Sequence, residues 1–467
     1  MSLLSSLADI LGQKNVLTGE ELAPYLTDWR NMATGKAQAA VKPGTTEEVA
    51  AVVKLCAAAG VPVVTQGGNT SLVGGATPDA SGRAVILLTS RLNKIRAVDP
   101  DNATITVEAG LILQNLQQAA RDAGFLFPLS LAAEGSCTVG GNLATNAGGT
   151  QVLRYGNMRD LTLGLEVVCA DGEIWNGLRG LRKDNTGYDL RDLFIGSEGT
   201  LGIITAATLK LFPQPAAKCT AMLALSSVEN AVAVLRRARK AFDTALTGYE
   251  LMAGICLDMV HSCFPQQKLP FADRPVWYAL LEISDSEGED HARAMFEAML
   301  GESLEAGEID DAVIAENLQQ SKDLWHLRES ITLAQAQAVK SIKHDISVPV
   351  SRIADFIATT DAACQGRFPG LLNMTFGHLG DGNLHYNVGT SETFTGADMA
   401  RDYDAIYNLV HDAAHAYAGS ISAEHGIGSF KIDEMPRYKA PRELDLMQRI
   451  KTAFDPGNIL NPGKVLR

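Results

Sequence analysis

The sequence has little of what would suggest a disulfide framework, a membrane segment or a nucleic-acid partner. Its seven cysteines are an odd number and form no Cys-x-x-Cys pair, which argues against a disulfide-built fold and against a thiolate zinc site. No stretch approaches the roughly 18 apolar residues of a transmembrane helix. The net charge of −14 argues against nucleic acid and anionic membranes, although a locally cationic pocket would still accept a small acid.

Targeting features are also absent from the first residues. Residues 1–11 have neither a basic region before a long apolar run nor the arginine-rich bias of a transit peptide. Together with the cysteine usage, this predicts a protein of the reducing cytoplasm. The 467 residues, of which 46% are hydrophobic and 20% charged, suffice for two or three globular domains.

What the sequence does have is glycine, gathered into three segments of small residues at 66–75, 135–149 and 195–205. Successive N–H groups in such loops form a nest for a phosphate or pyrophosphate. The first loop follows a predicted strand at 61–65, but it is neither a Walker motif nor a GxGxxG fingerprint. A tight backbone packing would explain one such segment. Three of them favour a long ligand, such as a dinucleotide, laid along one domain.

A second feature lies at residues 377–387, which predict a β-hairpin with Asp381 and Gly382 as a type I′ turn. In that register His378 stands directly opposite His385, with Cβ atoms roughly 5 Å apart. Asn387 projects from the same face as His385. The pair is therefore a candidate metal site, with an ordinary polar pair on a hairpin surface as the alternative.

Two further histidine-containing segments bear on this site. Glu424 and His425 offer a carboxylate and a third imidazole in a glycine-flanked loop, and two histidines with one carboxylate form a catalytic zinc-type ligand set. His411 and His415 also share a helix face, but Asp412 is not a glutamate and no third ligand is nearby in the sequence. We interpret that second pair as a helix face near the surface.

The composition changes after residue 214, where the glycine-rich segments stop and strands begin to alternate with helices. This order predicts an α+β domain with an antiparallel sheet and helices on one face. The acidic stretch 285–311 is predicted to be a solvated face or loop. We expect domains at 1–214, 215–410 and 411–467, the last a helical segment closing on the first. The predicted strands are 221–224, 246–251, 277–283 and 346–350, and the predicted helices are 228–241, 289–300 and 321–340.

Six motifs, in order, carry a family resemblance. The three glycine-rich segments, GHLGDGNLHYNV at 377–388, AEHGIG at 423–428 and DPGNILNPGK at 455–464 together resemble the FAD-linked oxidoreductases of the vanillyl-alcohol oxidase type, with their C-terminal FAD-linked oxidase domain. Residues 183–202 and 324–332 are similar to the D-2-hydroxyglutarate dehydrogenases of that family. The resemblance implies an α+β fold, with a two-subdomain FAD-binding domain, then an antiparallel-sheet substrate domain and a helical tail.

The resemblance also implies an FAD with its pyrophosphate on residues 66–75. Asn69 stands where some members attach FAD covalently to a histidine, so the implied FAD is non-covalent. The implied cofactor-binding residues are Gln66, Gly67, Gly68, Asn69, Thr70, Ser71, Gly74, Gly135, Ser136, Thr138, Gly140, Gly141, Asn142, Thr145, Gly148, Gly149, Glu198, Gly199, Ile203 and Ile204.

For the substrate domain, the resemblance implies metal ligands at His378, His385 and Glu424, with His425 as general base. Zinc suits these ligands, and manganese and cobalt accept the same set. The implied substrate contacts are Arg328, Thr332, Lys343, Asn387 and His425. Physically, the arginine offers a bidentate fork, the lysine a point charge and the threonine a hydroxyl. The alternative is that Arg328 and Lys343 are surface charges paired with neighbouring carboxylates.

The resulting hypothesis is oxidation of D-2-hydroxyglutarate to 2-oxoglutarate, with D-malate as a second substrate. A flavin takes the hydride, a metal polarises the hydroxyl and a neutral histidine accepts its proton. The resemblance implies an electron carrier such as electron-transfer flavoprotein as acceptor. A D-lactate or glycolate dehydrogenase is the alternative within the family. A zinc hydrolase and a non-catalytic binding protein are the alternatives outside it, and the oligomeric state stays open, with a homodimer as one option.

Overall fold

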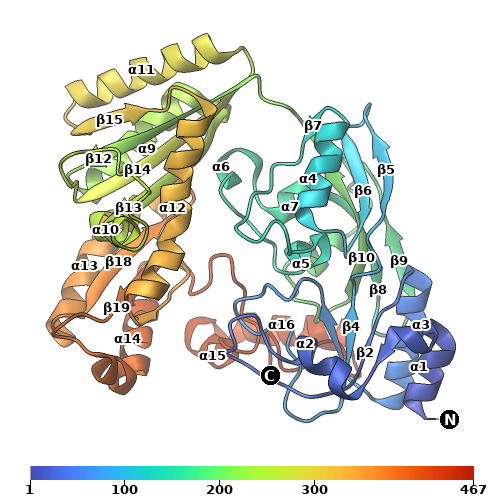
Figure 1. Cartoon of the computed structure of the whole chain (residues 1–467). Helices are drawn as coiled ribbons and strands as arrows, with labels where there is room; N and C mark the ends of the chain where they lie inside the picture. Colours follow the sequence, from blue (N-terminus) through green and yellow to red (C-terminus); the bar gives the residue numbers. More distant parts are fainter. Residues whose placement is uncertain (1) are drawn as a thin grey trace. The chain divides into compact units, whose positions relative to one another are not determined.

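The computed structural model describes residues 2–467, which form two compact units (Figure 1). The first unit comprises the chain up to Gly149, residues 156–214 and residues 424–467, and the second comprises residues 150–155 and 215–423. The C-terminal part of the first unit therefore starts at Glu424 rather than at residue 411. The reason is helix α14 (Gly396–Ala416), which buries Ile406 and Val410 in the core of the second unit.

The first unit begins with a four-stranded sheet in the order β1 (Val16–Leu17), β2 (Ala37–Val41), β4 (Ala84–Leu88) and β3 (Val63–Gln66). Strands β2, β4 and β3 run parallel, and helices α1 (Leu3–Leu11) and α3 (Thr46–Ala59) contribute to its core. Thr45 caps α3 by accepting the N–H of Glu48, and Gly60 ends it at a φ of 60°.

A five-stranded antiparallel sheet completes the first unit, in the order β5 (Ile95–Asp99), β6 (Thr104–Glu108), β10 (Ile203–Lys210), β8 (Thr162–Val168) and β9 (Ile174–Gly177). Its connections hold α4 (Leu113–Asp122), α5 (Val139–Ala144), α7 (Met158–Leu161) and α8 (Arg191–Phe194), while α2 (Ala23–Leu26) lies in the N-terminal part. Strand β7 (Phe125–Leu126) pairs with β11 (Phe212–Pro213). Two sheets in one unit agree with the predicted two-subdomain organisation.

The second unit is built on an eight-stranded sheet whose described strand pairs are all antiparallel. The order is β15 (Asp311–Ile314), β12 (Ala217–Leu225), β14 (Trp277–Asp285), β13 (Leu246–Ala253), β18 (Leu372–Gly377), β19 (Asn383–Gly389) and β16 (Ser341–Ile342), with β17 (Ile346–Ser347) also on β19. The α+β class is confirmed. The short β17 replaces the predicted strand 346–350.

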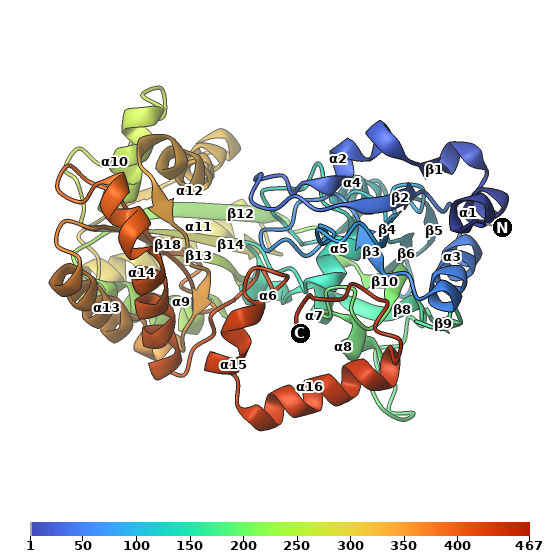
Figure 2. The same cartoon turned by 90° about the horizontal axis from the view of Figure 1, so that it is seen from below.

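Helices cover both faces of this sheet, not one face as predicted. Alternate strand residues enter two cores, Leu223 on one side and Met222 on the other. Helices α9 (Val228–Phe242), α11 (Glu289–Glu305), α13 (Ile353–Arg367) and α14 pack on the first side, and α10 (Gly254–Cys263) and α12 (Leu318–Ala338) on the second. Figure 2 shows α10 and α12 on the side of the strands opposite α9 and α13. Helix α6 (Val152–Tyr155) also belongs to this unit.

The C-terminal residues return to the first unit. After the short helix α15 (Met435–Tyr438) and helix α16 (Pro441–Phe454), Leu460 forms a bridge with Val63 beside β3. The Asp455 carboxylate accepts the N–H groups of Ile459 and Leu460, at 3.0 and 2.8 Å. No helix among residues 2–467 is long and apolar enough to cross a membrane.

Candidate functional site

Two of the glycine-rich segments lie against each other in the first unit. A Cβ atom on Gly67 would collide with the hydroxyl of Thr138, and one on Gly68 would collide with the carbonyl of Ser136. The missing side chains therefore allow the two loops to approach closely, so packing accounts for these two glycines.

The loop after β3 also has the backbone arrangement of an anion site. None of the N–H groups of residues 68–72 donates a hydrogen bond to another residue within the described range 2–467. Asn69 adopts a left-handed φ of 52°, and its side-chain amide donates to the carbonyl of Thr27 at 2.9 Å. Successive N–H groups that the protein leaves unused fit a pyrophosphate. The loop predicted to hold the cofactor can therefore do so through its backbone.

The third glycine-rich segment joins the second through backbone bonds from Gly196 to Leu143 and from Glu198 to Ala144. The Glu198 carboxylate accepts the N–H groups of Ile427 and Gly428, each at 2.7 Å. Burial raises the pKa of Glu198 even though these N–H groups and two lysines oppose the shift. Glu198, a predicted cofactor contact, thus uses its side chain to hold the loop that follows His425.

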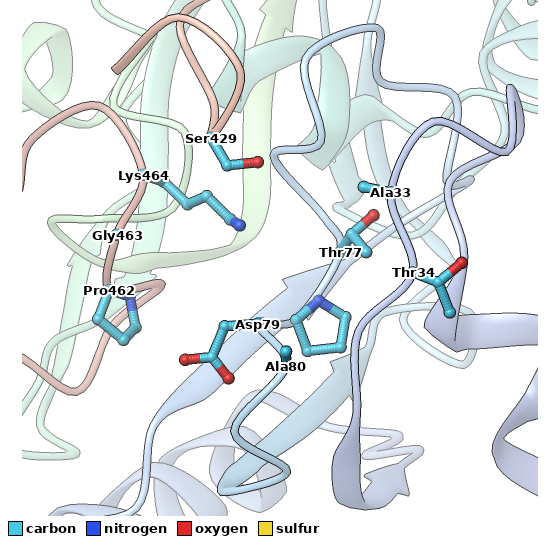
Figure 3. Close-up of a pocket in the computed structure, with 10 residues that line it drawn as sticks. Ala33, Thr34, Thr77, Asp79, Ala80, Ser429, Pro462, Gly463 and Lys464 are labelled. Atoms are coloured by element: carbon cyan, nitrogen blue, oxygen red, sulfur yellow. The ribbon is translucent and has the colours of Figure 1, made fainter. Parts of the chain in front are cut away.

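A cavity of about 330 Å³ opens in the first unit, lined in part by residues 77–80, which follow the N–H-rich loop at residues 68–72 in the sequence. Figure 3 shows the Lys464 ammonium reaching toward it between Ser429 and Asp79. Burial lowers the pKa of Lys464, although Asp79 and Glu198 oppose that shift. None of the predicted cofactor, substrate or metal residues, all of which the structure describes, lines this cavity. Its lining residues are Ala33, Thr34, Thr77, Pro78, Asp79, Ala80, Ser429, Pro462, Gly463 and Lys464.

The predicted hairpin is present in the second unit as β18 and β19, but its register is different. Phe376, and not His378, stands opposite His385. The turn is longer than two residues, because the N–H of Gly382 reaches the carbonyl of His378 and the side chain of Asp381 accepts the N–H of Asn383. The imidazoles of His378 and His385 nevertheless remain adjacent, with ring centroids 5.7 Å apart.

A buried carboxylate that the sequence interpretation missed supports this pair. Glu250, on β13, is 1% exposed and lies 2.6 Å from Nδ1 of His378 and 2.8 Å from Nε of Arg328. Burial alone would raise its pKa, but the charge of Arg328 and the hydrogen bonds from Arg328 and His378 outweigh burial and hold the pKa of Glu250 well below its usual range. The sequence signal that could have revealed Glu250 is its position as an ionisable residue in the largely apolar predicted strand 246–251.

The described residues 2–467 contain two groups of three side chains whose ligand atoms lie within 4.8 Å of one another. One is His378, His385 and Glu424, and the other is Asp345, Glu424 and His425. Glu424 directly follows Ala423, the last residue of the second unit, whose N–H donates to the carbonyl of Asp345 at 3.2 Å. Two imidazoles and a carboxylate are a donor set that fits a divalent ion of the zinc type.

The predicted substrate contacts have different environments. Arg328 is buried on α12 with its guanidinium over the ring of Phe376, whereas Thr332 on the same helix and Lys343 after β16 are exposed. Asn387 is buried, and its amide donates to Gln335 while its oxygen accepts the N–H of His344.

One histidine prediction was wrong. His411 is fully buried, 4.2 Å between ring centroids from Tyr407 and 5.5 Å from His344, while His415 is exposed as expected. The face of α14 that carries His411 packs inward against the second unit's own core, so the helical spacing alone did not reveal its burial. His344, for which the sequence suggested no cluster, donates its Nδ1–H to the carbonyl of Tyr386 at 2.8 Å.

Comparison with known proteins identifies the family. Residues 37–177 match the model of an FAD binding domain, and residues 214–465 match that of the FAD linked oxidases, C-terminal domain. The chain belongs to the FAD-linked oxidases. The predicted family is therefore confirmed, and this FAD-linked oxidase is an FAD-dependent oxidoreductase.

Relatives of this oxidase align along almost its entire length. It is 38% identical over 468 residues to the D-2-hydroxyglutarate dehydrogenase, mitochondrial, of Bos taurus, covering 99% of this chain and 83% of the relative. It is 39% identical over 445 residues to the D-2-hydroxyglutarate dehydrogenase of Xanthomonas citri pv. viticola, covering 95% and 92%.

Solved structures support the same fold. The oxidase is similar to p-cresol methylhydroxylase with substrate bound, with a TM-score of 0.78 at 18% identity over 99% of this chain and 96% of that one. It is also similar to alkyldihydroxyacetonephosphate synthase, with a TM-score of 0.73 at 17% identity over 98% and 84%. At these identities the likeness establishes the fold alone.

Proposed function

We propose that this oxidase converts a D-2-hydroxy acid, D-2-hydroxyglutarate in the first place, to the 2-oxo acid. The observation that carries the proposal is the identity of 38–39% over 95–99% of the chain to proteins named D-2-hydroxyglutarate dehydrogenase. The imidazole pair and the buried cation of the second unit suit such an acid, because it carries a hydroxyl to deprotonate and carboxylates to bind.

In the proposed mechanism, FAD supplies the hydride acceptor when bound. The backbone N–H groups of residues 68–72 would hold its pyrophosphate, and Asn69, in place of a histidine, would leave it non-covalent. His378, His385 and Glu424 would hold a divalent ion, which would supply a Lewis acid for the substrate hydroxyl; zinc, manganese and cobalt all accept these ligands. His425 would accept the hydroxyl proton.

The substrate carboxylates require cations and hydroxyl donors. Because Nε of Arg328 is engaged by Glu250, its terminal nitrogens are the ones to meet a carboxylate. Lys343 and Thr332 are exposed enough to add a charge and a hydroxyl. Asn387 already has hydrogen bonds at both ends of its amide, so it contacts the substrate only by exchanging one of them.

The proposal also includes D-malate as a second substrate, electron-transfer flavoprotein as electron acceptor, a homodimer and a cytoplasmic location. The proposed location differs from that of the Bos taurus relative, whose name includes "mitochondrial". D-lactate or glycolate remains the alternative substrate class, and a zinc hydrolase the alternative outside the family's usual chemistry.

The decisive experiment is the absorbance spectrum of the purified protein before and after anaerobic addition of D-2-hydroxyglutarate. A flavin band that bleaches supports the reaction and the substrate together. A band that bleaches only with D-lactate or glycolate would replace the substrate. Chelation should then abolish bleaching while the flavin stays bound, and turnover by metal-free protein, verified by elemental analysis, would refute the Lewis-acid role.

A further inference from the structure

Glu250 occupies an unusual place in the second unit. It lies in β13 between Tyr249, Leu251 and Met252, whose side chains enter apolar cores. Its two carboxylate oxygens are divided between two partners, Oε1 facing His378 and Oε2 facing Arg328. Desolvation strongly disfavours a buried carboxylate unless such partners offset it, so this residue is not explained by packing of the sheet alone.

The contact with His378 determines which ring nitrogen carries the proton. An ionised carboxylate only accepts hydrogen bonds, so Nδ1 of His378 must be the donor across the 2.6 Å contact. The lone pair of the neutral ring then resides on Nε2. A histidine that binds a metal through Nε2 needs this tautomer, and a hydrogen bond at the other nitrogen is what selects it.

The contact between Glu250 and Arg328 also supports His385, through the ring of Phe376. Arg328 comes from α12 and stacks over Phe376, with 4.9 Å between the guanidinium carbon and the ring centroid. Phe376 is the strand partner of His385, and their ring centroids are also 4.9 Å apart. One carboxylate therefore holds His378 directly and, through Arg328 and Phe376, supports the ring beside it.

We propose that Glu250 is the positioning residue of this site, fixing the Nε2-binding tautomer of His378 and the orientation of Arg328 at the same time. The inference rests on the metal role proposed above for His378. It assigns a function to a residue that touches neither the metal nor the substrate, and it links the metal ligand to the substrate's cation through a single side chain.

Glu250→Gln tests this assignment because both partners of Glu250 are donors. A glutamine amide offers one acceptor and one donor, so it can satisfy Arg328 or the Nδ1–H of His378 but not both. Zinc affinity of the metal-free full-length holoflavoprotein is measured by competition with a chromophoric chelator. The expected result is a loss of roughly ten- to one-hundred-fold in zinc affinity. Glu250→Asp, which keeps the charge, should recover part of it.

Glu282→Gln is the matched control. Glu282 lies on the neighbouring strand β14, is 5% exposed, and also pairs with α12, through Nε1 of Trp325 at 2.7 Å. Its loss removes a buried carboxylate from the same face of the sheet without touching either histidine. The control should therefore keep its zinc affinity even if it unfolds at a lower temperature. Equal losses in the two variants would overturn the proposal.

The tautomer is read independently of metal from ¹⁵N-edited spectra of the imidazoles, with His378 assigned through His378→Gln. The expected signature is an Nδ1–H ring in the wild type and a shift toward Nε2–H in Glu250→Gln. An unchanged His378 signature, or wild-type zinc affinity in Glu250→Gln, refutes the positioning role while leaving the metal site intact. A wild-type protein that binds no zinc at all would overturn the metal site as well.

Discussion

At the scale of single residues, the site combines side chains that sequence motifs reveal with one that they do not. His378, His385 and Glu424 stand in glycine-bearing motifs, and the hairpin pattern together with the family resemblance predicted them as a ligand set. Their ligand atoms lie within 4.8 Å of one another. Glu250 has no motif, because a buried ion pair between distant parts of the chain leaves no local pattern. Only the fold reveals that strand β13 passes beside the hairpin.

Lys343 tests whether the substrate is a dicarboxylate. Lys343→Ala should raise the KM for D-2-hydroxyglutarate by about tenfold, the equivalent of about 1.4 kcal/mol, because a charge-assisted contact to the distal carboxylate is lost. The KM for D-lactate, which lacks that carboxylate, should stay unchanged in steady-state assays. Lys340→Ala, at another exposed lysine of the same segment, is the control. An equal rise for both substrates would contradict the role of Lys343.

At the scale of elements, the predictions failed where tertiary contacts override local patterns. The hairpin was correct as an element, but its register was wrong because Asp381 and Gly382 belong to a longer turn. In the acidic stretch 285–311, the predicted helix 289–300 is present as α11, which continues to Glu305. Its Phe296 and Met299 pack on the sheet while its carboxylates face solvent, so the stretch is both a helix and a solvated face.

The start of α11 offers a test by pH. Nδ1 of His291 lies 2.9 Å from the carboxylate of Asp285, and this contact raises the pKa of His291. Burial would raise the pKa of Asp285. The N–H groups of residues 287 and 288 and the contact with His291 outweigh burial, so the pKa of Asp285 is lowered. Because the pKa of His291 is higher in the folded state than its unfolded value of 6.5, the protonated imidazole stabilises the fold at pH values below 6.5. This stabilisation is lost as the pH rises through the folded-state pKa. The carboxylate's contribution is lost only as the pH falls below its unfolded value of 3.8.

His291→Gln should therefore lower the melting temperature more at about pH 6 than at about pH 9, where the wild-type imidazole is neutral. Thermal unfolding followed by circular dichroism at the two pH values measures the difference. Arg293→Gln, which removes an exposed pair with Glu297 and leaves the contact between His291 and Asp285 in place, should give the same shift at both. A pH-independent effect of His291→Gln would show that its charge contributes nothing.

The loop that follows His425 is a second element with a specific requirement. Gly428 has a φ of 51°, and a Cβ atom there would collide with the carbonyl of Val73 in the N–H-rich loop after β3. Gly428→Ala should destabilise the first unit by roughly 2–4 kcal/mol, from backbone strain and collision together, and weaken FAD retention. Gly60→Ala, at a φ of 60° with open space around it, should cost only about 1 kcal/mol in denaturant titrations. Equal costs would mean that the close approach of the two loops is unimportant.

At the scale of the whole molecule, the first unit is discontinuous in sequence, and its last part is held by buried polar contacts. Lys451 donates to the carbonyls of Thr200 and Leu460 and to Asp455, while the side chain of Asn461 donates to the carbonyls of Gly75 and Glu198. A composition change could predict where the glycine-rich part ends. It could not predict that the unit is completed by residues more than two hundred positions later, because the connecting contacts are long-range.

This organisation predicts different behaviour for fragments of the chain. Residues 1–214 alone should be unstable and should not bind FAD, since removal of the C-terminal part takes away the N–H partners of the Thr200 carbonyl and of the Glu198 carboxylate. Joining residues 424–467 to residue 214 through a flexible linker should restore a cooperative transition and a flavin spectrum. Residues 215–423 carry the eight-stranded sheet and both of its helical faces, so they should fold alone, with some loss from the missing contact between Arg154 and the carbonyl of Ser284. Flavin binding by residues 1–214 alone would show that the C-terminal part serves only the site around Glu424 and not the stability of the unit that it completes.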